Sequence, residues 1–149
     1  MKTIFNQDIR IELISRINKL QQDSVPLWGQ MNVFQMTKHC TQWDEWVLGI
    51  HHPKYKQSFL GLIFGKMALR SSVKDDTPIQ KNMPAGFLKV TEKHGDVERQ
   101  KQQWITRVLE YGHFSNDAFI HDFFGKMSNE EIGIFAYKHA DHHLRQFNV

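Results

Sequence analysis

Two histidines near the C-terminal end of the sequence have the spacing of a metal-binding pair. His139 and His143 are four residues apart, so on a helix both side chains project from one face, about one turn apart. Ile132 and Phe135 fall on the same face, which directs the two imidazoles toward the protein core rather than into water. Two neutral imidazoles that converge in this way form half of a site for a divalent metal ion.

A third ligand has to come from another helix, and His39 is the best candidate. At ~100° per residue, His39 lies at the edge of the apolar stripe to which Met36 and Trp43 belong. One histidine from this helix and two from the C-terminal helix would leave coordination positions open for water or substrate, as in catalytic metal sites. The competing interpretation is that these histidines are hydrogen-bonded core residues that hold no metal.

Two further side chains lie near enough to support such a site. Gln42 is one turn beyond His39 and is placed to orient a bound water or to hydrogen-bond a ligand imidazole. His142 is rotated away from the line of the paired histidines, which favours a place at the rim of the site over direct ligation. Because Ala140 stands where an H-E-x-x-H motif has glutamate, a zincin protease is not expected. The catalytic residues themselves stay unknown.

Four amphipathic helices are predicted to position these residues. Apolar residues recur at helical spacing in four stretches, at about residues 8–22, 32–50, 96–111 and 128–147. Asp8 is the expected N-cap of the first helix. Asn32 with Gln35, and Ser128 with Glu131, have the spacing of capping boxes at the second and fourth helices.

The connection between the second and third helices is long. Gly49 is expected to end the second helix, and Gly112 is the expected C-cap of the third. Residues 59–70 are compatible with an additional short helix, and residues 77–87, with two prolines and a glycine, indicate an irregular crossover. No alternation is strong enough to indicate a sheet. The predicted fold class is therefore all-α, a four-helix bundle with a long crossover between helices two and three.

Composition limits the class of protein further. The 149 residues predict one domain, 1–149, and 23% charged with 40% hydrophobic residues is an ordinary globular composition. A lone cysteine, Cys40, fits a reducing compartment, and no apolar run reaches the roughly 18 residues of a membrane span. The net charge of +3 is spread along the chain, unlike the basic stripe of a nucleic-acid binder. We therefore expect a cytoplasmic protein with no nucleic-acid or membrane partner.

Several segments together resemble a known family. Residues 139–146 (HADHHLRQ) resemble the end of DinB-like (YfiT-like) four-helix-bundle proteins, whose last helix carries H-x-x-H-H followed by Arg and Gln. The similarity extends to residues 26–29 (PLWG), 36–40 (MTKHC) and 121–128 (HDFFGKMS), and so covers nearly the whole chain. The chain thus resembles a DinB-related group of uncharacterised bacterial proteins.

The resemblance implies a metal site and a choice of chemistries. In the wider superfamily, one histidine of the second helix and the H-x-x-x-H pair of the last helix hold a metal, which implies His39, His139 and His143 here. Zn²⁺, Ni²⁺ or Fe²⁺ would suit three imidazoles. The superfamily includes thiol-dependent transferases and frequent homodimers, so a small-molecule substrate and a homodimer are implied, but fold alone does not choose the reaction.

Two classes of function stay open at this point. The first is a metal-dependent hydrolase or thiol S-transferase, in which the metal lowers the pKa of a water or a thiol. The second is a non-catalytic helical bundle that binds a metal or small ligand, or acts through association. A fourth protein ligand, such as His142 or His121, would close the site and favour the second class.

Overall fold

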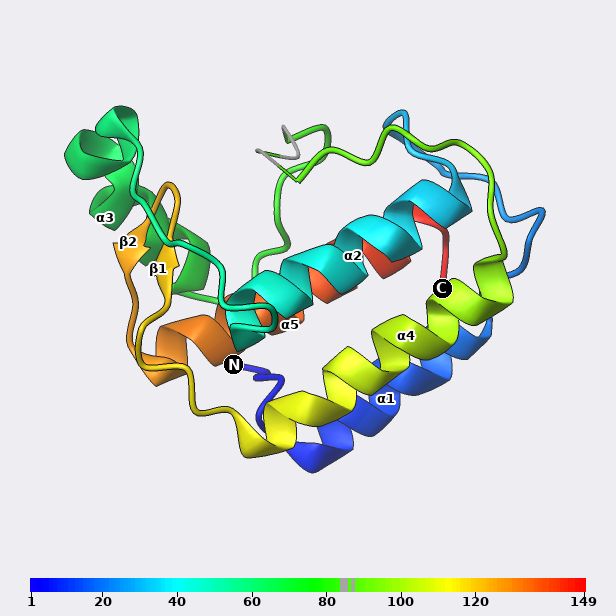
Figure 1. Ribbon diagram of the computed structural model, residues 1–149, viewed down its shortest axis with the longest axis horizontal. Helices are drawn as coiled ribbons and strands as arrows, with labels where there is room; N and C mark the ends of the chain where they lie inside the picture. Colours follow the sequence, from blue (N-terminus) through cyan, green and yellow to red (C-terminus); the bar gives the residue numbers. More distant parts are fainter. Residues whose placement is uncertain (84–85, 87) are drawn as a thin grey trace.

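Helices account for most of the chain, as the apolar periodicity predicts. The computed structural model describes residues 1–83, 86 and 88–149, and within these it contains five α-helices, a 3₁₀ turn and a two-stranded hairpin (Figure 1). In chain order they are α1 (Gln7–Asn18), α2 (Val33–Leu48), α3 (Phe59–Val73), α4 (Val97–Glu110), η1 (Tyr111–His113), β1 (Ile120–His121), β2 (Gly125–Lys126) and α5 (Asn129–Gln146). The predicted all-α class is confirmed.

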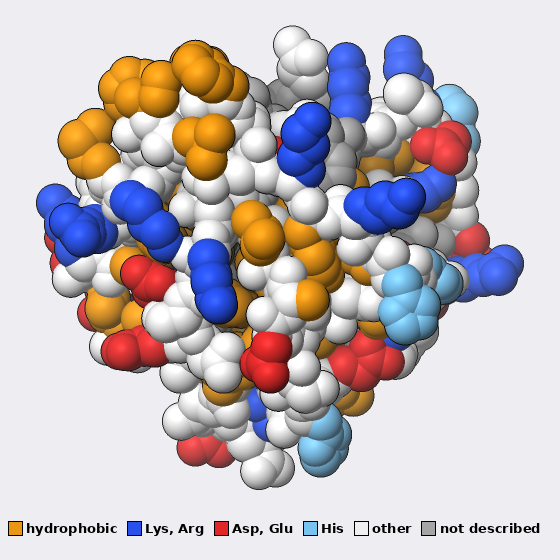
Figure 2. All heavy atoms as spheres, turned by 60° about the vertical axis from the view of Figure 1, so that its left-hand side comes forward, with side chains coloured by type: hydrophobic (Ala, Val, Ile, Leu, Met, Phe, Trp, Pro, Cys, Tyr) orange, Lys and Arg blue, Asp and Glu red, His pale blue; other side chains and the backbone are white. Residues whose placement is uncertain are grey.

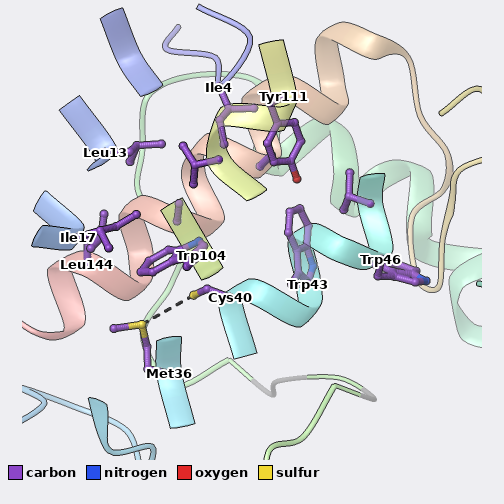
Figure 3. Packing of buried hydrophobic residues seen from close by; sticks show 14 of the residues in the cluster. Ile4, Leu13, Ile17, Met36, Cys40, Trp43, Trp46, Trp104, Tyr111 and Leu144 are labelled. Atoms are coloured by element: carbon purple, nitrogen blue, oxygen red, sulfur yellow. Dashed lines mark hydrogen bonds between the residues drawn. The ribbon is translucent and has the colours of Figure 1, made fainter. Parts of the chain in front are cut away.

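Four of these helices form the bundle. In Figure 1, α2 lies along α5 and α4 lies along α1, and α2 also packs on α4 and α1 on α5, so that each helix has two neighbours. Their apolar faces meet around Trp104 of α4, which has no exposed surface. Figure 3 shows Ile17 and Leu144 close to this indole. Each such buried side chain stabilises the fold by roughly 1.5–3 kcal/mol.

Helix α2, which carries His39, and helix α5, which carries His139 and His143, both begin where the sequence predicts. Asn32 and Gln35 form a reciprocal capping box at α2, with N–H to side-chain oxygen distances of 2.9 and 3.2 Å. Ser128 and Glu131 form the same motif at α5. Gly49 ends α2 in the left-handed conformation, at φ +79°, where a residue without a Cβ is preferred.

The first helix begins within a residue of the predicted start, but its predicted N-cap and its predicted end are wrong. Asn6, not Asp8, is the N-cap, because its side chain accepts the backbone N–H of Asp8 at 2.8 Å. Asp8 therefore lies in the first turn, where its charge still favours the helix. The helix ends at Asn18 rather than near residue 22, because the backbone N–H of Gln21 turns back to the Ser24 hydroxyl at 2.9 Å.

The end of α4 also differs from the prediction. Gly112 is not its C-cap: Tyr111 holds that position in a right-handed conformation and the chain continues into η1. The Tyr111 hydroxyl donates to Asp44 in the core at 2.9 Å, and this bond holds the residue in place. The short hairpin was not predicted either, since two residues per strand are too few for alternation to appear in a sequence.

The predicted helix in the long crossover is confirmed as α3, which extends to Val73 and packs on the hairpin. Gly61 and Gly65 face the Phe123 carbonyl, and a Cβ at either position would lie 2.3 or 2.1 Å from that oxygen. At the other end, the buried Lys138 ammonium of α5 donates to three backbone carbonyls, that of Ser72 in the last turn of α3 and those of Asp75 and Thr77 just beyond it. The crossover predicted at residues 77–87 includes 84, 85 and 87, which lie outside the described residues.

The opposite side of α3 is apolar and exposed, and Figure 2 shows hydrophobic side chains gathered at that corner of the molecule. None of the helices in the described part of the chain is long and apolar enough to cross a membrane.

Asp44 is a buried carboxyl in the middle of the bundle. Its two oxygens accept hydrogen bonds from the Trp104 indole N–H at 3.0 Å and the Tyr111 hydroxyl at 2.9 Å. Burial raises the pKa of Asp44 to about 7 although both hydrogen bonds favour the ionised form. The folded protein therefore binds a proton here more tightly than an ordinary aspartate does.

Candidate metal centre

The three predicted histidines converge between α2 and α5. One ring nitrogen from each of His39, His139 and His143 lies within 4.8 Å of the others. The Nε2 atoms of His39 and His139 are 3.3 Å apart, and the ring of His143 lies 5.0 and 4.8 Å, centroid to centroid, from those two rings. With small side-chain adjustments, the three ring nitrogens are close enough together to bind one transition-metal ion.

Two of the imidazoles are oriented by hydrogen bonds on the side away from the cluster. The Nδ1 atom of His39 lies 2.8 Å from the Leu88 carbonyl oxygen, and Nδ1 of His143 lies 3.0 Å from Oε1 of Gln146. The Gln146 amide is itself fixed, because its Nε2 donates to the Trp28 carbonyl at 2.7 Å. Since both acceptors can only accept, each histidine carries its proton on Nδ1 and leaves Nε2 with a free lone pair.

Burial keeps all three rings neutral. It is the main cause that lowers the pKa of His39, lowers that of His143 to about 3 and holds that of His139 well below its usual value. Mutual repulsion among the imidazolium forms lowers the pKa of His139 and His143 further. The cluster is therefore in the neutral, ligating form at physiological pH.

The donor set fits a divalent cation. With the Nδ1 protons of His39 and His143 directed outward, their Nε2 lone pairs are left without protons, and His139 has a single ring proton to share. His139 alone can thus satisfy one of these nitrogens but not both. A cation that accepts all three lone pairs removes this deficit, whereas hydrogen bonding within the cluster leaves one nitrogen unpartnered.

His139 differs from the other two histidines in its surroundings. As a residue it is partly exposed, while His39 and His143 are buried. The His139 ring stacks on Trp43 with centroids 4.3 Å apart, and Trp43 in turn contacts Phe135 at 6.0 Å. Two surface cavities, of about 360 and 340 Å³, lie between α1 and α4, and neither is lined by these histidines. An aromatic stack therefore covers one side of the His139 ring.

The other singled-out residues lie outside the cluster. Nδ1 of His142 is 3.3 Å from the Ile79 carbonyl, and Gln42 is half-buried without a hydrogen bond to the described residues. Their supporting roles stay predictions. His121 packs on Phe124 at 4.4 Å, and its Nδ1 accepts backbone N–H groups of its own loop. Within the described residues, the cluster thus has three histidines and no fourth protein ligand.

Cys40 is buried in the core and is not a nucleophile. Figure 3 shows it directed at Met36, with the two sulfur atoms 3.8 Å apart. Burial raises the pKa of the Cys40 thiol, which disfavours the reactive thiolate.

Sequence reasoning missed the groups that orient the imidazoles. Gln146 has a signal, since it follows His143 by three residues and lies on the same helical face. The Leu88 and Trp28 carbonyls have none, because every residue carries such a group and only the fold brings these two to the site.

Comparison with known proteins gives one match. The model of a family described as "Protein of unknown function (DUF1569)" matches residues 7–149. The searches of curated proteins and of solved structures found no match to this chain.

Proposed function

Because this chain belongs to the DUF1569 family, whose description states no activity, its function has to be argued from its own residues, and we propose that it is a metal-dependent enzyme. Its metal ligands are His39, His139 and His143, and its reaction is a hydrolysis or the transfer of a thiol to an electrophile. The resemblance of residues 139–146 to the last helix of DinB-like proteins supports the same ligand set.

The observation that carries the proposal is the arrangement of protons around the cluster. Outward Nδ1–H bonds on His39 and His143 present unprotonated nitrogens to a common centre, with three protein donors and no fourth among the described residues. Structural zinc sites close all four positions with protein ligands, and catalytic ones keep a position open. The donor count therefore favours a site that takes water or substrate.

A divalent ion in such a site supplies Lewis acidity, which brings the pKa of a water or a thiol toward neutrality. The chain supplies the surroundings. Trp43 stacks on His139 and contacts Phe135, and these apolar rings keep the local dielectric low and suit a substrate with an apolar portion. Leu88 and Gln146 hold two ligands in the tautomer that ligates.

Metal content is the first test. Untagged protein is expected to contain about one equivalent of Zn²⁺, Ni²⁺ or Fe²⁺ by elemental mass spectrometry, since three histidines form one site. His143→Ala should lose the metal, and the matched control His113→Ala, which removes an exposed histidine outside the cluster, should keep it. Absence of metal in the unmodified protein after reconstitution at neutral pH contradicts the proposal.

The burial of the cluster favours a second candidate, a bundle that holds a metal without catalysis. His39 is 2% exposed and His143 is 7% exposed, and the two cavities between α1 and α4 do not reach them. Cobalt-substituted protein separates the two functions. A change of its visible spectrum on addition of a small thiol shows an exchangeable position and supports the enzyme, while an unchanged spectrum supports the non-catalytic bundle.

A further inference from the structure

The outer face of α3 is an unusual surface for a helix of this length. Six large apolar side chains on it are about half exposed or more: Phe59 (75%), Leu60 (60%), Leu62 (68%), Ile63 (57%), Phe64 (48%) and Met67 (68%). Single exposed apolar residues are ordinary, but a contiguous group of this size marks a binding surface. Figure 2 shows these hydrophobic side chains projecting together from the corner that α3 occupies in Figure 1.

Packing and hydrogen bonds fix α3 in the orientation that exposes its apolar face. Its other side is fully used, since Gly61 and Gly65 pack on the Phe123 backbone and Leu69 has no exposed surface. At the C-terminal end of α3, the Lys138 ammonium fixes the chain by donating to the carbonyls of Ser72, Asp75 and Thr77. Rotation that buried the apolar face would break these contacts, so the face stays available to a partner.

The charge on α3 and on the segment that leads into it has one sign. Residues 46–74 contain no Asp or Glu, and they carry five exposed basic residues: Lys54, Lys56, Lys66, Arg70 and Lys74. Lys66 donates to the Lys126 carbonyl of the hairpin, which adds another exposed lysine to the same region. Lys74 also pairs with Asp75, 3.8 Å away, just beyond the helix. Figure 2 shows Lys and Arg side chains on the face below the apolar group.

We propose that α3 docks the protein on a membrane surface that contains anionic phospholipids. The apolar side chains enter the boundary between headgroups and acyl chains, and the basic residues contact the phosphates. This proposal replaces the expectation, drawn from the lack of a long apolar run, that the protein has no membrane partner. Docking on a surface needs no spanning helix, and none of the described helices is one. A second copy of the chain fits less well, because joining two such faces brings basic residues together with no acidic residue of 46–74 to pair with them.

Vesicle cosedimentation of the full chain tests the proposal. We expect binding to phosphatidylcholine vesicles with ~30% phosphatidylglycerol, weakening as salt is raised, and little binding to phosphatidylcholine alone. Phe59→Ser/Ile63→Ser and Lys56→Glu/Arg70→Glu should each lower the partition constant at least about tenfold.

Matched controls come from other faces of the molecule. Val25→Ser/Ile11→Ser removes apolar side chains of the same exposure, 75% and 57%, as Phe59 and Ile63. Lys89→Glu/Arg99→Glu applies the same change of charge, also at exposed positions. Both controls should bind as the unmodified protein does. Circular dichroism checks that each variant is folded.

Absence of binding to anionic vesicles overturns the proposal, as does an equal loss of binding in the controls. A dimer in light scattering that the Phe59→Ser/Ile63→Ser variant dissociates, without vesicle binding, assigns the face to a second copy instead.

Discussion

Gln146 offers the sharpest test of how the histidine cluster is organised. Its Oε1 accepts the Nδ1 proton of His143, its Nε2 donates to the Trp28 carbonyl, and the residue is 3% exposed. Gln146→Leu keeps the approximate volume but removes both bonds. His143 is then free to change its tautomer and to rotate, while Trp28 keeps a carbonyl without its partner.

Two magnitudes follow from this geometry. Loss of a hydrogen bond that orients a ligand histidine typically lowers metal affinity about 10–100-fold. Separately, two polar groups lose their partners, the buried Nδ1–H of His143 and the partly buried Trp28 carbonyl, at about 1–3 kcal/mol each, so the free energy of unfolding of the metal-free protein should fall by about 2–6 kcal/mol. The loss of metal affinity reports on the site, and the loss of unfolding free energy reports on the fold.

The assay is a Zn²⁺ competition titration with a chromophoric chelator, with urea unfolding measured alongside on metal-free protein. Gln103→Leu is the control, because Gln103 is an exposed glutamine of α4 outside the histidine cluster, and the zinc affinity of this variant should stay unchanged. Gln146→Glu keeps an acceptor for His143 but loses the donor to Trp28, so it should be destabilised yet retain metal affinity.

Unchanged zinc affinity in a folded Gln146→Leu protein would refute this account, because His143 would then not need the bond. An equal loss of zinc affinity in Gln103→Leu would also refute it, since the effect would not be specific to the residue that orients the ligand.

Two further predictions concern the fold. The pKa of Asp44 is raised from 3.8 to about 7, so the stability carried by its protonated form is complete below pH 3.8 and is lost as pH rises through about 7. Asp44→Asn stays neutral and should remove this loss, on the order of 4 kcal/mol, in urea unfolding compared across that range; parallel pH profiles would contradict it. Gly65→Ala places a Cβ 2.1 Å from the Phe123 carbonyl and should lower the free energy of unfolding by about 1–3 kcal/mol. Gly112→Ala, whose Cβ would meet only the flexible end of Arg10, should cost less, and equal losses would argue against the tight contact at α3.

Much of the fold could be predicted from local sequence. Apolar periodicity located the helices, and the reciprocal side-chain pairs at Asn32 and Ser128 placed two helix starts correctly, since a capping box depends only on residues three apart. The start of α1 could not be chosen this way. Asn6 and Asp8 are both good N-caps, and the tertiary contact of Ile4 with Gly133 at 3.0 Å fixes which of them serves.

The convergence of the histidines was predictable for a similar reason. Helical geometry puts His139 and His143 on one face, and the apolar stripe of α2 points His39 into the same core. What could not be predicted is how the rings are held. The Leu88 carbonyl comes from a connection with little regular structure, whose path depends on packing rather than on side-chain type.

His39 and His139 are 100 residues apart in the chain, although their Nε2 atoms lie 3.3 Å apart in the fold. An unfolded chain offers a metal ion mainly the local pair on the last helix, and the third nitrogen arrives only when α2 packs on α5. Complete ligation therefore has to follow folding, because closing a loop of that length is opposed by chain entropy. A bound ion would hold α2 and α5 together, and its retention would report that these two distant segments had packed against each other.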